Sequence, residues 1–206
     1  MKKIGKTIIL VCMLSIGLIV SGCADSGSKS DATQSAEPQN VESQNNEDKA
    51  SDEQEPYMVS FTASTTDGQE FSSKQFGESK VTMINVWATY CNPCLMEMPD
   101  LGDIAESYDK ADFQLVGVIS DVMEDSPQSD IDNAKDLIEE TEANYPHLLL
   151  NQSLFENLIG GVSSVPTTFF VNSKGEMLGY VVGANDKETW IEIIDELLAK
   201  EGEADE

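Results

Sequence analysis

Two cysteines separated by two residues, Cys91 and Cys94, have the type and spacing that could carry chemistry in this chain. They follow an apolar strand pattern, residues 81–86, and stand where a helical pattern begins near Asn92. A thiol at a helix start faces unpaired backbone N–H groups and the positive end of the helix dipole, so its thiolate is stabilised. Because the thiolate is the attacking species in thiol–disulfide exchange, the pattern predicts a redox-active pair with Cys91 as the exposed thiol.

A zinc site and a purely structural disulfide are the alternatives for this pair. A zinc site needs a second pair of ligands, and the chain offers only Cys12, Cys23 and the single histidine His147. A Cys-x-x-Cys pair at a helix start is more often redox-active than structural. We therefore expect a redox pair without a metal or other cofactor.

Two segments resemble a known family. Residues 87–94 read Trp-Ala-Thr-Tyr-Cys-Asn-Pro-Cys and are followed by Glu-Met-Pro at 97–99, while residues 165–171 read Val-Pro-Thr-Thr-Phe-Phe-Val. Together they resemble the active-site signature of the thioredoxin superfamily, and more narrowly the extracytoplasmic TlpA/ResA-like thiol–disulfide oxidoreductases. The resemblance covers roughly residues 57–200.

The resemblance implies a role for each matching residue. Cys91 would be the nucleophile, Cys94 the resolving thiol, Pro166 a cis-proline beside the dithiol, and Glu97 a carboxylate that tunes both cysteines. Two alternatives stay open: a surface glutamate favoured by the helix dipole, and a trans-proline entering an edge strand. Asn85 occupies the position of the buried aspartate of cytosolic thioredoxins, so acid–base duty would pass to Glu97 or water. The residues expected to contact a client are Trp87, Tyr90, Asn92, Pro93 and Val165.

The N-terminal residues read as a targeting segment. Lysines at positions 2, 3 and 6 precede an apolar run, residues 8–20, that is too short for an ordinary membrane-spanning helix. The run ends in Ser-Gly-Cys at 21–23, which resembles the lipobox of bacterial lipoproteins. We expect residues 1–22 to be a lipoprotein signal peptide and Cys23 to be lipidated at the extracytoplasmic face of the membrane. An ordinary signal peptide or an uncleaved anchor is the alternative.

Composition divides the remainder of the chain. Residues 23–56 are polar and are predicted to be a disordered tether, and residues 201–206 to be an acidic tail. Residues 57–200 have the length and apolar content of one folded domain. The net charge of −26 and the absence of arginine argue against a nucleic-acid partner, which requires basic contacts to phosphates.

The folded part predicts an α/β architecture. Two strand patterns flank Asp67-Gly68 as a hairpin, and a central strand at 81–88 is followed by a helix from Asn92 to about Tyr108. The further elements expected are strands at 113–119, 147–150, 165–171 and 177–182, helices at 129–143 and 187–200, and a helical turn at 154–159. The pattern predicts a three-layer α/β/α sandwich with a mixed sheet, and the resemblance makes it thioredoxin-like, with a central helix-containing insertion around residues 121–145.

These observations predict a membrane-anchored thiol–disulfide oxidoreductase, most consistent with a reductase of client protein disulfides. We expect a monomer, and the resemblance implies that it receives electrons from a CcdA-type membrane carrier. A peroxiredoxin-type peroxidase is one alternative, but its motif needs proline at 84 and serine or threonine at 88, where the chain has Ile84 and Ala88. A copper-delivery protein is another, but its cysteines are one residue further apart and its histidine stands later in the chain.

Overall fold

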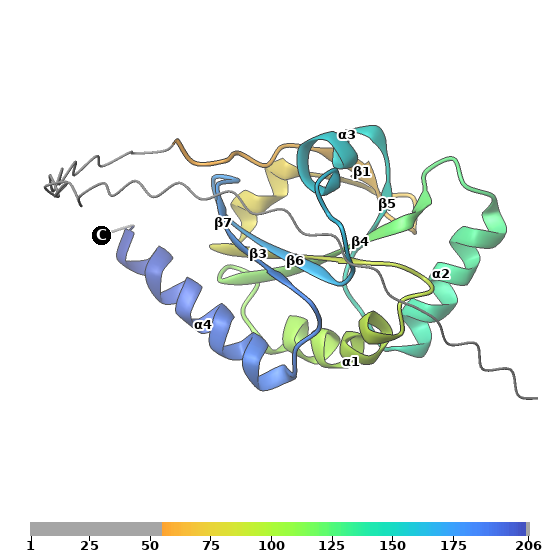
Figure 1. Ribbon diagram of the computed structural model, residues 1–206. Helices are drawn as coiled ribbons and strands as arrows, with labels where there is room; N and C mark the ends of the chain where they lie inside the picture. The colour runs from red at the N-terminus through yellow and green to blue at the C-terminus, as the bar shows by residue number, and fades with distance from the viewer. Residues whose placement is uncertain (1–54, 205–206) are drawn as a thin grey trace, which may run out of the picture. The chain divides into compact units, whose positions relative to one another are not determined.

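A five-stranded mixed sheet, in the order β5-β4-β3-β6-β7, forms the centre of the fold (Figure 1). The computed structural model describes residues 55–204. The elements in chain order are β1 (Thr62–Ser64), β2 (Glu70–Ser72), the 3-10 helix η1 (Ser73–Glu78), β3 (Val81–Trp87), α1 (Asn92–Ser107), β4 (Phe113–Met123), α2 (Gln128–Glu140), β5 (His147–Leu150), α3 (Gln152–Leu154), the π-helical turn η2 (Phe155–Ile159), β6 (Thr167–Asn172), β7 (Met177–Val182) and α4 (Lys187–Ala204).

Strand β3 lies in the middle of the sheet and every one of its residues is buried. It runs parallel to β4 and antiparallel to β6, while β4 is parallel to β5 and β6 is antiparallel to β7. A strand buried on both faces must be apolar nearly throughout, which explains the continuous apolar run in the sequence. The exceptions are Thr82 and Asn85.

The two faces of the sheet carry separate apolar clusters. Because successive side chains of a strand point to opposite faces, Met83 and Trp87 pack with α1, α2 and α4, whereas Ile84 and Val86 pack on the other side. That second side is covered by the β1–β2 hairpin together with η1, α3 and η2. Figure 1 shows these elements and the α1–α4 pair on opposite sides of the sheet. The predicted three-layer fold with a mixed sheet and an N-terminal hairpin is confirmed.

Several predicted boundaries differ from the observed ones. The hairpin at Asp67-Gly68 forms, with Gly68 at a φ of 76°, but its strands are only three residues long. The second predicted strand gives way at Ser73 to the 3-10 helix η1, because the Gln75 side chain accepts a hydrogen bond from the Ser72 N–H and starts a helical turn. At the other end, α4 continues through Ala204 rather than stopping at residue 200.

The insertion between β4 and β5 contains α2, as predicted. β5 joins β4 at Gly117, which lies opposite His147 in the register. A Cβ atom at Gly117 would stand 2.3 Å from His147 Nδ1, so only glycine leaves room for the imidazole ring. Among residues 55–204, no helix is long and apolar enough to cross a membrane.

Candidate active site

The disulfide between Cys91 and Cys94 lies where β3 leaves the sheet and α1 begins. Their Cα atoms are 5.3 Å apart, within the ordinary range for a disulfide. Cys91 is the N-cap of α1, and its Sγ accepts a hydrogen bond of 3.3 Å from the Cys94 N–H. Pro93 occupies the first turn, where its missing N–H leaves no bond unmade. The pair is therefore seated on the positive end of the helix dipole.

The two cysteines differ in their access to solvent. Cys91 is 6 % exposed and Cys94 is fully buried. Cys91 is therefore the more accessible of the two cysteines. Cys91 was predicted to be the exposed thiol. It is the less buried of the two cysteines, but it is itself largely buried.

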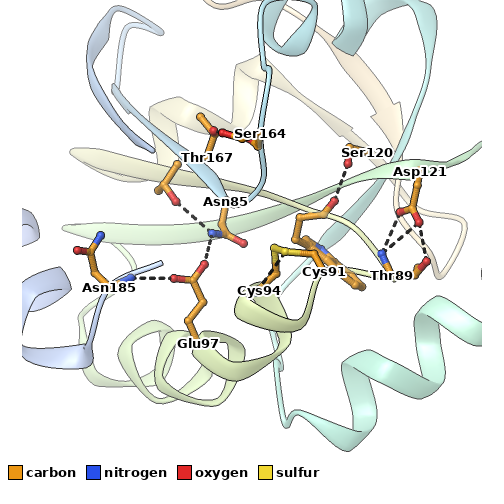
Figure 2. Close-up of a disulfide and its surroundings, with 12 residues drawn as sticks. Asn85, Thr89, Cys91, Cys94, Glu97, Ser120, Asp121, Ser164, Thr167 and Asn185 are labelled. Carbon is orange, nitrogen blue, oxygen red and sulfur yellow. Dashed lines mark hydrogen bonds between the residues drawn. A yellow bond between two sulfur atoms is a disulfide. The ribbon is translucent and has the colours of Figure 1, made fainter. Parts of the chain in front are cut away.

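Glu97 lies one turn after Cys94 on the inner side of α1 and is 3 % exposed. Its Oε1 accepts a hydrogen bond from Asn85 Nδ2 at 3.1 Å, and its Oε2 accepts one from the Asn185 N–H at 3.3 Å (Figure 2). Burial raises the pKa of Glu97 from 4.5 to about 7, although hydrogen bonds from Asn85 and Asn185 oppose the rise. The alternative of a surface glutamate is therefore wrong, the role of Glu97 in tuning the cysteines stays a prediction, and its carboxyl group can both bind and release a proton near neutral pH.

Asn85 connects Glu97 to the cis-proline strand. Its Nδ2 donates to Glu97 and also to Thr168 Oγ1 at 3.1 Å. With both amide protons used in this way, its Oδ1 is a buried acceptor that has no hydrogen-bond partner among residues 55–204. In Figure 2 the Asn85 side chain lies between Glu97 and the disulfide. Because the side chain at position 85 is a neutral amide, it cannot exchange a proton. The titratable side chain that it contacts is Glu97.

The loop that enters β6 faces the same site. The Val165–Pro166 peptide bond is cis, as the resemblance implied. Pro166 is buried and Val165 is half-buried. Within the described part of the chain, neither the N–H nor the C=O of Val165 has a hydrogen-bond partner. These two groups are therefore available to an extended chain lying beside the loop.

One predicted client contact is wrong. Trp87 is fully buried, and its indole Nε1–H donates to His147 Nδ1 at 3.1 Å, so it cannot touch a client. His147 in turn donates from Nε2 to the Ala143 carbonyl at 3.1 Å, which fixes it as a neutral ring. Burial lowers the pKa of His147 from 6.5 to about 4. His147 is thus a structural residue that holds Trp87, the last residue of β3, through a hydrogen bond.

The other predicted client contacts do reach the surface. Tyr90 is 75 % exposed, and Asn92 and Pro93 are also exposed. They flank Cys91 on the protein surface, as the motif spacing suggested. Whether they contact a client stays a prediction.

A carboxylate that the sequence reasoning missed holds the loop before Cys91. Asp121, near the end of β4, accepts hydrogen bonds from both the N–H and the Oγ1 of Thr89 (Figure 2). The nearby Ser120 hydroxyl donates to the Trp87 carbonyl at 2.9 Å. The sequence carried no local signal for these contacts, because they join residues more than 30 positions apart.

Some predictions fall outside this site. The signal peptide, the lipidated Cys23 and most of the tether at 23–56 lie outside the described residues. Within 55–204, no group of three or more histidine, cysteine, aspartate or glutamate side chains is arranged to hold a metal ion.

Comparison with known proteins agrees with this geometry. Residues 56–178, more than half of the chain, match the AhpC/TSA family. The chain belongs to the AhpC/TSA family. This AhpC/TSA protein is 29% identical over 129 residues to the thiol:disulfide interchange protein HelX of Rhodobacter capsulatus, covering 63% of this chain and 67% of HelX. It is 23% identical over 130 residues to the thiol–disulfide oxidoreductase ResA of Bacillus thuringiensis, covering 62% of this chain and 69% of ResA.

A solved structure supports the same assignment. The thioredoxin-family thiol:disulfide interchange protein of Chlorobium tepidum superposes with a TM-score of 0.57 at 26% identity, covering 69% of this chain and 97% of that one. The fold is therefore thioredoxin-like. Together with the Cys91–Cys94 disulfide, these similarities make this AhpC/TSA-family chain a thiol–disulfide oxidoreductase.

Proposed function

We propose that this protein is a lipid-anchored, extracytoplasmic reductase of protein disulfides that works through a mixed disulfide on Cys91. The observation that carries this proposal is the unequal burial of two bonded cysteines at a helix start, with the Cys94 N–H donating to Cys91 Sγ. A backbone donor and the helix dipole both favour the thiolate of Cys91 once the disulfide is reduced.

The reaction proceeds in two exchanges. The Cys91 thiolate attacks one sulfur of a client disulfide, forming a Cys91–client bond and releasing the other client sulfur as a thiolate. The Cys94 thiolate then attacks Cys91 Sγ, which re-forms the Cys91–Cys94 disulfide and releases the second client thiolate. Two electrons pass from the protein dithiol to the client. The unpaired N–H and C=O of Val165 suit an extended client segment during both steps.

We assign to Glu97 the role of accepting the proton of the Cys94 thiol. Cys94 is buried, so its thiol needs a nearby acceptor in order to become the attacking thiolate. A carboxyl group with a pKa of about 7, one helical turn away, is half-ionised at neutral pH and suits that transfer. Glu97→Gln should therefore slow the second exchange more than the first, in stopped-flow measurements that separate the two.

Single-cysteine variants test the order of attack. Cys94→Ser should accumulate a mixed disulfide between Cys91 and a model client such as insulin, visible by mass spectrometry and released by dithiothreitol. Cys91→Ser should form none and should lose insulin reduction. Insulin reduction by Cys91→Ser at the wild-type rate would refute the mechanism. Peroxide consumption that survives Cys94→Ser would instead favour a peroxidase.

The direction of electron flow is tested by the reduction potential of the Cys91–Cys94 couple. A reductase requires a potential well below about −200 mV, whereas a strong oxidant such as DsbA lies near −120 mV. Equilibration with glutathione and dithiothreitol buffers, read by trapping free thiols, gives this value. A potential near that of DsbA would reverse the proposed direction.

The location is proposed from the N-terminal sequence. Positive charge, a short apolar run and Ser-Gly-Cys23 support lipidation at the extracytoplasmic face of the membrane. The resemblance to the TlpA/ResA-like proteins supports electron supply by a CcdA-type membrane carrier, and we propose that the protein acts as a monomer. In bacterial cells, the wild-type protein should take up labelled fatty acid and sediment with membranes. Cys23→Ala should do neither, and membrane retention of that variant without label would indicate an uncleaved anchor.

A further inference from the structure

Two surface hollows flank the disulfide. One, of about 220 Å³, is lined by Tyr90 and Val165, and the other, of about 450 Å³, is lined by Pro93 and Glu97. Figure 2 shows the disulfide between Glu97 and Asn185, which line the larger hollow, on one side and Ser120, which lines the smaller hollow, on the other. A client segment crossing Cys91 would place side chains into both.

The hollow on the Tyr90 side combines aromatic and aliphatic side chains with three serines. Its apolar lining residues are Tyr90, Leu150, Phe155, Ile159, Val162 and Val165. Phe155 is 51 % exposed and Tyr90 is 75 % exposed, so two aromatic rings face solvent beside the redox pair. Phe155 belongs to the π-helical turn η2, a form of helix that occurs frequently at functional sites. Covering these rings with a client side chain would remove apolar surface from water.

The hollow on the Pro93 side is acidic. Asp100 and Asp186 line it together with Glu97, and Met96 at its edge is 80 % exposed. Among residues 55–204, no lysine lines either hollow, although Lys187 beside Asp186 pairs with Asp103 and interacts electrostatically with Asp100. Hydrogen bonds from Thr189 lower the pKa of Asp186, which keeps that carboxylate ionised. The charge of this hollow therefore favours a cationic side chain.

We propose that the protein selects extended client segments in which the reactive cysteine has a bulky apolar residue on one side and a lysine or arginine on the other. This inference rests on the proposed reductase function and names its substrate class. In an extended segment, side chains two positions from the cysteine point to the same face as the cysteine, about 7 Å to either side. Those two positions are the ones that meet the hollows when the segment lies along Val165.

The test uses short peptides with one cysteine, each bonded through a disulfide to 2-nitro-5-thiobenzoate. Attack of Cys91 on the peptide sulfur releases the coloured thiolate, and Cys94 then releases the peptide thiol, so one dithiol is oxidised for each disulfide reduced. The peptides carry phenylalanine or serine at one flanking position and lysine or glutamate at the other, in both orders. Stopped-flow traces with the pre-reduced protein in excess over peptide give the second-order rate constant for each peptide.

The phenylalanine–lysine peptide, in one of the two orders, should react fastest. Phenylalanine should gain about tenfold over serine, and lysine about threefold over glutamate at low salt. Raising the salt to about 0.5 M should remove the lysine preference and leave the phenylalanine preference.

Matched variants assign each preference to its hollow. Phe155→Ala should remove most of the phenylalanine preference, whereas Tyr180→Ala, which removes a 66 % exposed ring that lines neither hollow, should keep it. The double variant Asp100→Asn/Asp186→Asn should remove the lysine preference. Its asparagine at 186 can still accept the hydrogen bond from the Thr189 N–H that begins α4.

The control for charge is Asp136→Asn/Glu140→Gln, which removes the same two charges from exposed positions on α2 and should keep the lysine preference. Equal rates for all peptides with the wild-type protein overturn the inference and leave the reductase function standing. A preference for glutamate, or a loss of discrimination in the control variants equal to that in the hollow variants, also overturns it. Failure to release the coloured thiolate from any peptide refutes the reductase function itself.

Discussion

Replacing Glu97 by glutamine should change how the stability of the oxidised protein depends on pH. Glu97 is 3 % exposed, and its burial raises its pKa from 4.5 to about 7. Between these two values the folded protein holds a proton that the unfolded chain has released. The contribution of this proton is therefore fully present below pH 4.5 and is lost as the pH rises through about 7.

The magnitude follows from the displacement of the pKa. At about 1.4 kcal/mol for each pH unit, ionising Glu97 inside the folded protein costs about 3 kcal/mol. Glutamine has no charge to bury, so Glu97→Gln does not lose this stability at high pH. Its amide cannot accept the hydrogen bond from the Asn185 N–H while accepting that from Asn85, which costs about 1 kcal/mol at every pH.

Urea unfolding of the oxidised proteins from pH 4 to pH 9 measures the effect. The variant should be less stable than the wild type by about 1 kcal/mol at pH 4 and more stable by about 2 kcal/mol at pH 9. Keeping the disulfide intact removes the titration of Cys91 and Cys94. Glu106→Gln, on the exposed side of α1, serves as the control for the loss of one charge and should follow the wild-type pH dependence.

A change of less than about 1 kcal/mol between the two pH values would refute the reasoning, because one raised pKa unit already corresponds to that amount. It would mean that the folded protein holds an ionised Glu97 without penalty. The carboxyl group could then not serve as the proton acceptor for Cys94 at neutral pH. A change of the opposite sign would lead to the same conclusion.

Further predictions concern the support of the site. Gly117→Ala should destabilise the protein by about 2 kcal/mol or more in urea unfolding, because the new Cβ atom would stand 2.3 Å from His147 Nδ1. The control Gly179→Ala should not, because a Cβ atom at that position would have no atom within 4 Å. Burial lowers the pKa of His147 from 6.5 to about 4, so the stabilisation from its neutral ring is fully present above pH 6.5 and is lost as the pH falls through 4. In thermal unfolding between these pH values, the melting temperature of His147→Gln should therefore fall less steeply with decreasing pH than that of the wild type. Asp121→Ala, which frees Thr89, should alter the reduction potential of the disulfide while lowering stability by only about 1 kcal/mol; an unchanged potential would mean that the loop keeps its position without this carboxylate.

Local patterns in the sequence predicted the elements and the redox pair because each depends on neighbouring residues. The Asp67-Gly68 turn, the buried run of β3 and the helix start at Asn92 all follow from side chains within a few positions. The 3-10 helix η1 was missed although Ser72 and Gln75 carry a helix-start signature. The prediction that Trp87 contacts a client was wrong because the sequence does not show whether an aromatic residue beside a redox motif lies on the surface or in the core.

The contacts that hold the site depend instead on strand register, which one sequence does not reveal. Trp87 pairs with Ile119 in the parallel β3–β4 ladder, so two residues further along each strand Thr89 meets Asp121. The same sheet places His147 beneath Trp87, although 60 positions separate them in the chain. Because the parallel strands β3 and β4 end at the same edge of the sheet, Asp121 at the end of β4 can hold the loop before Cys91. His147, at the start of β5, holds the last residue of β3, Trp87, through its indole N–H. The helix dipole can act on Cys91 only while that loop holds the sulfur over the first turn of α1, so we infer that the redox properties of the pair depend on register contacts as well as on the motif itself.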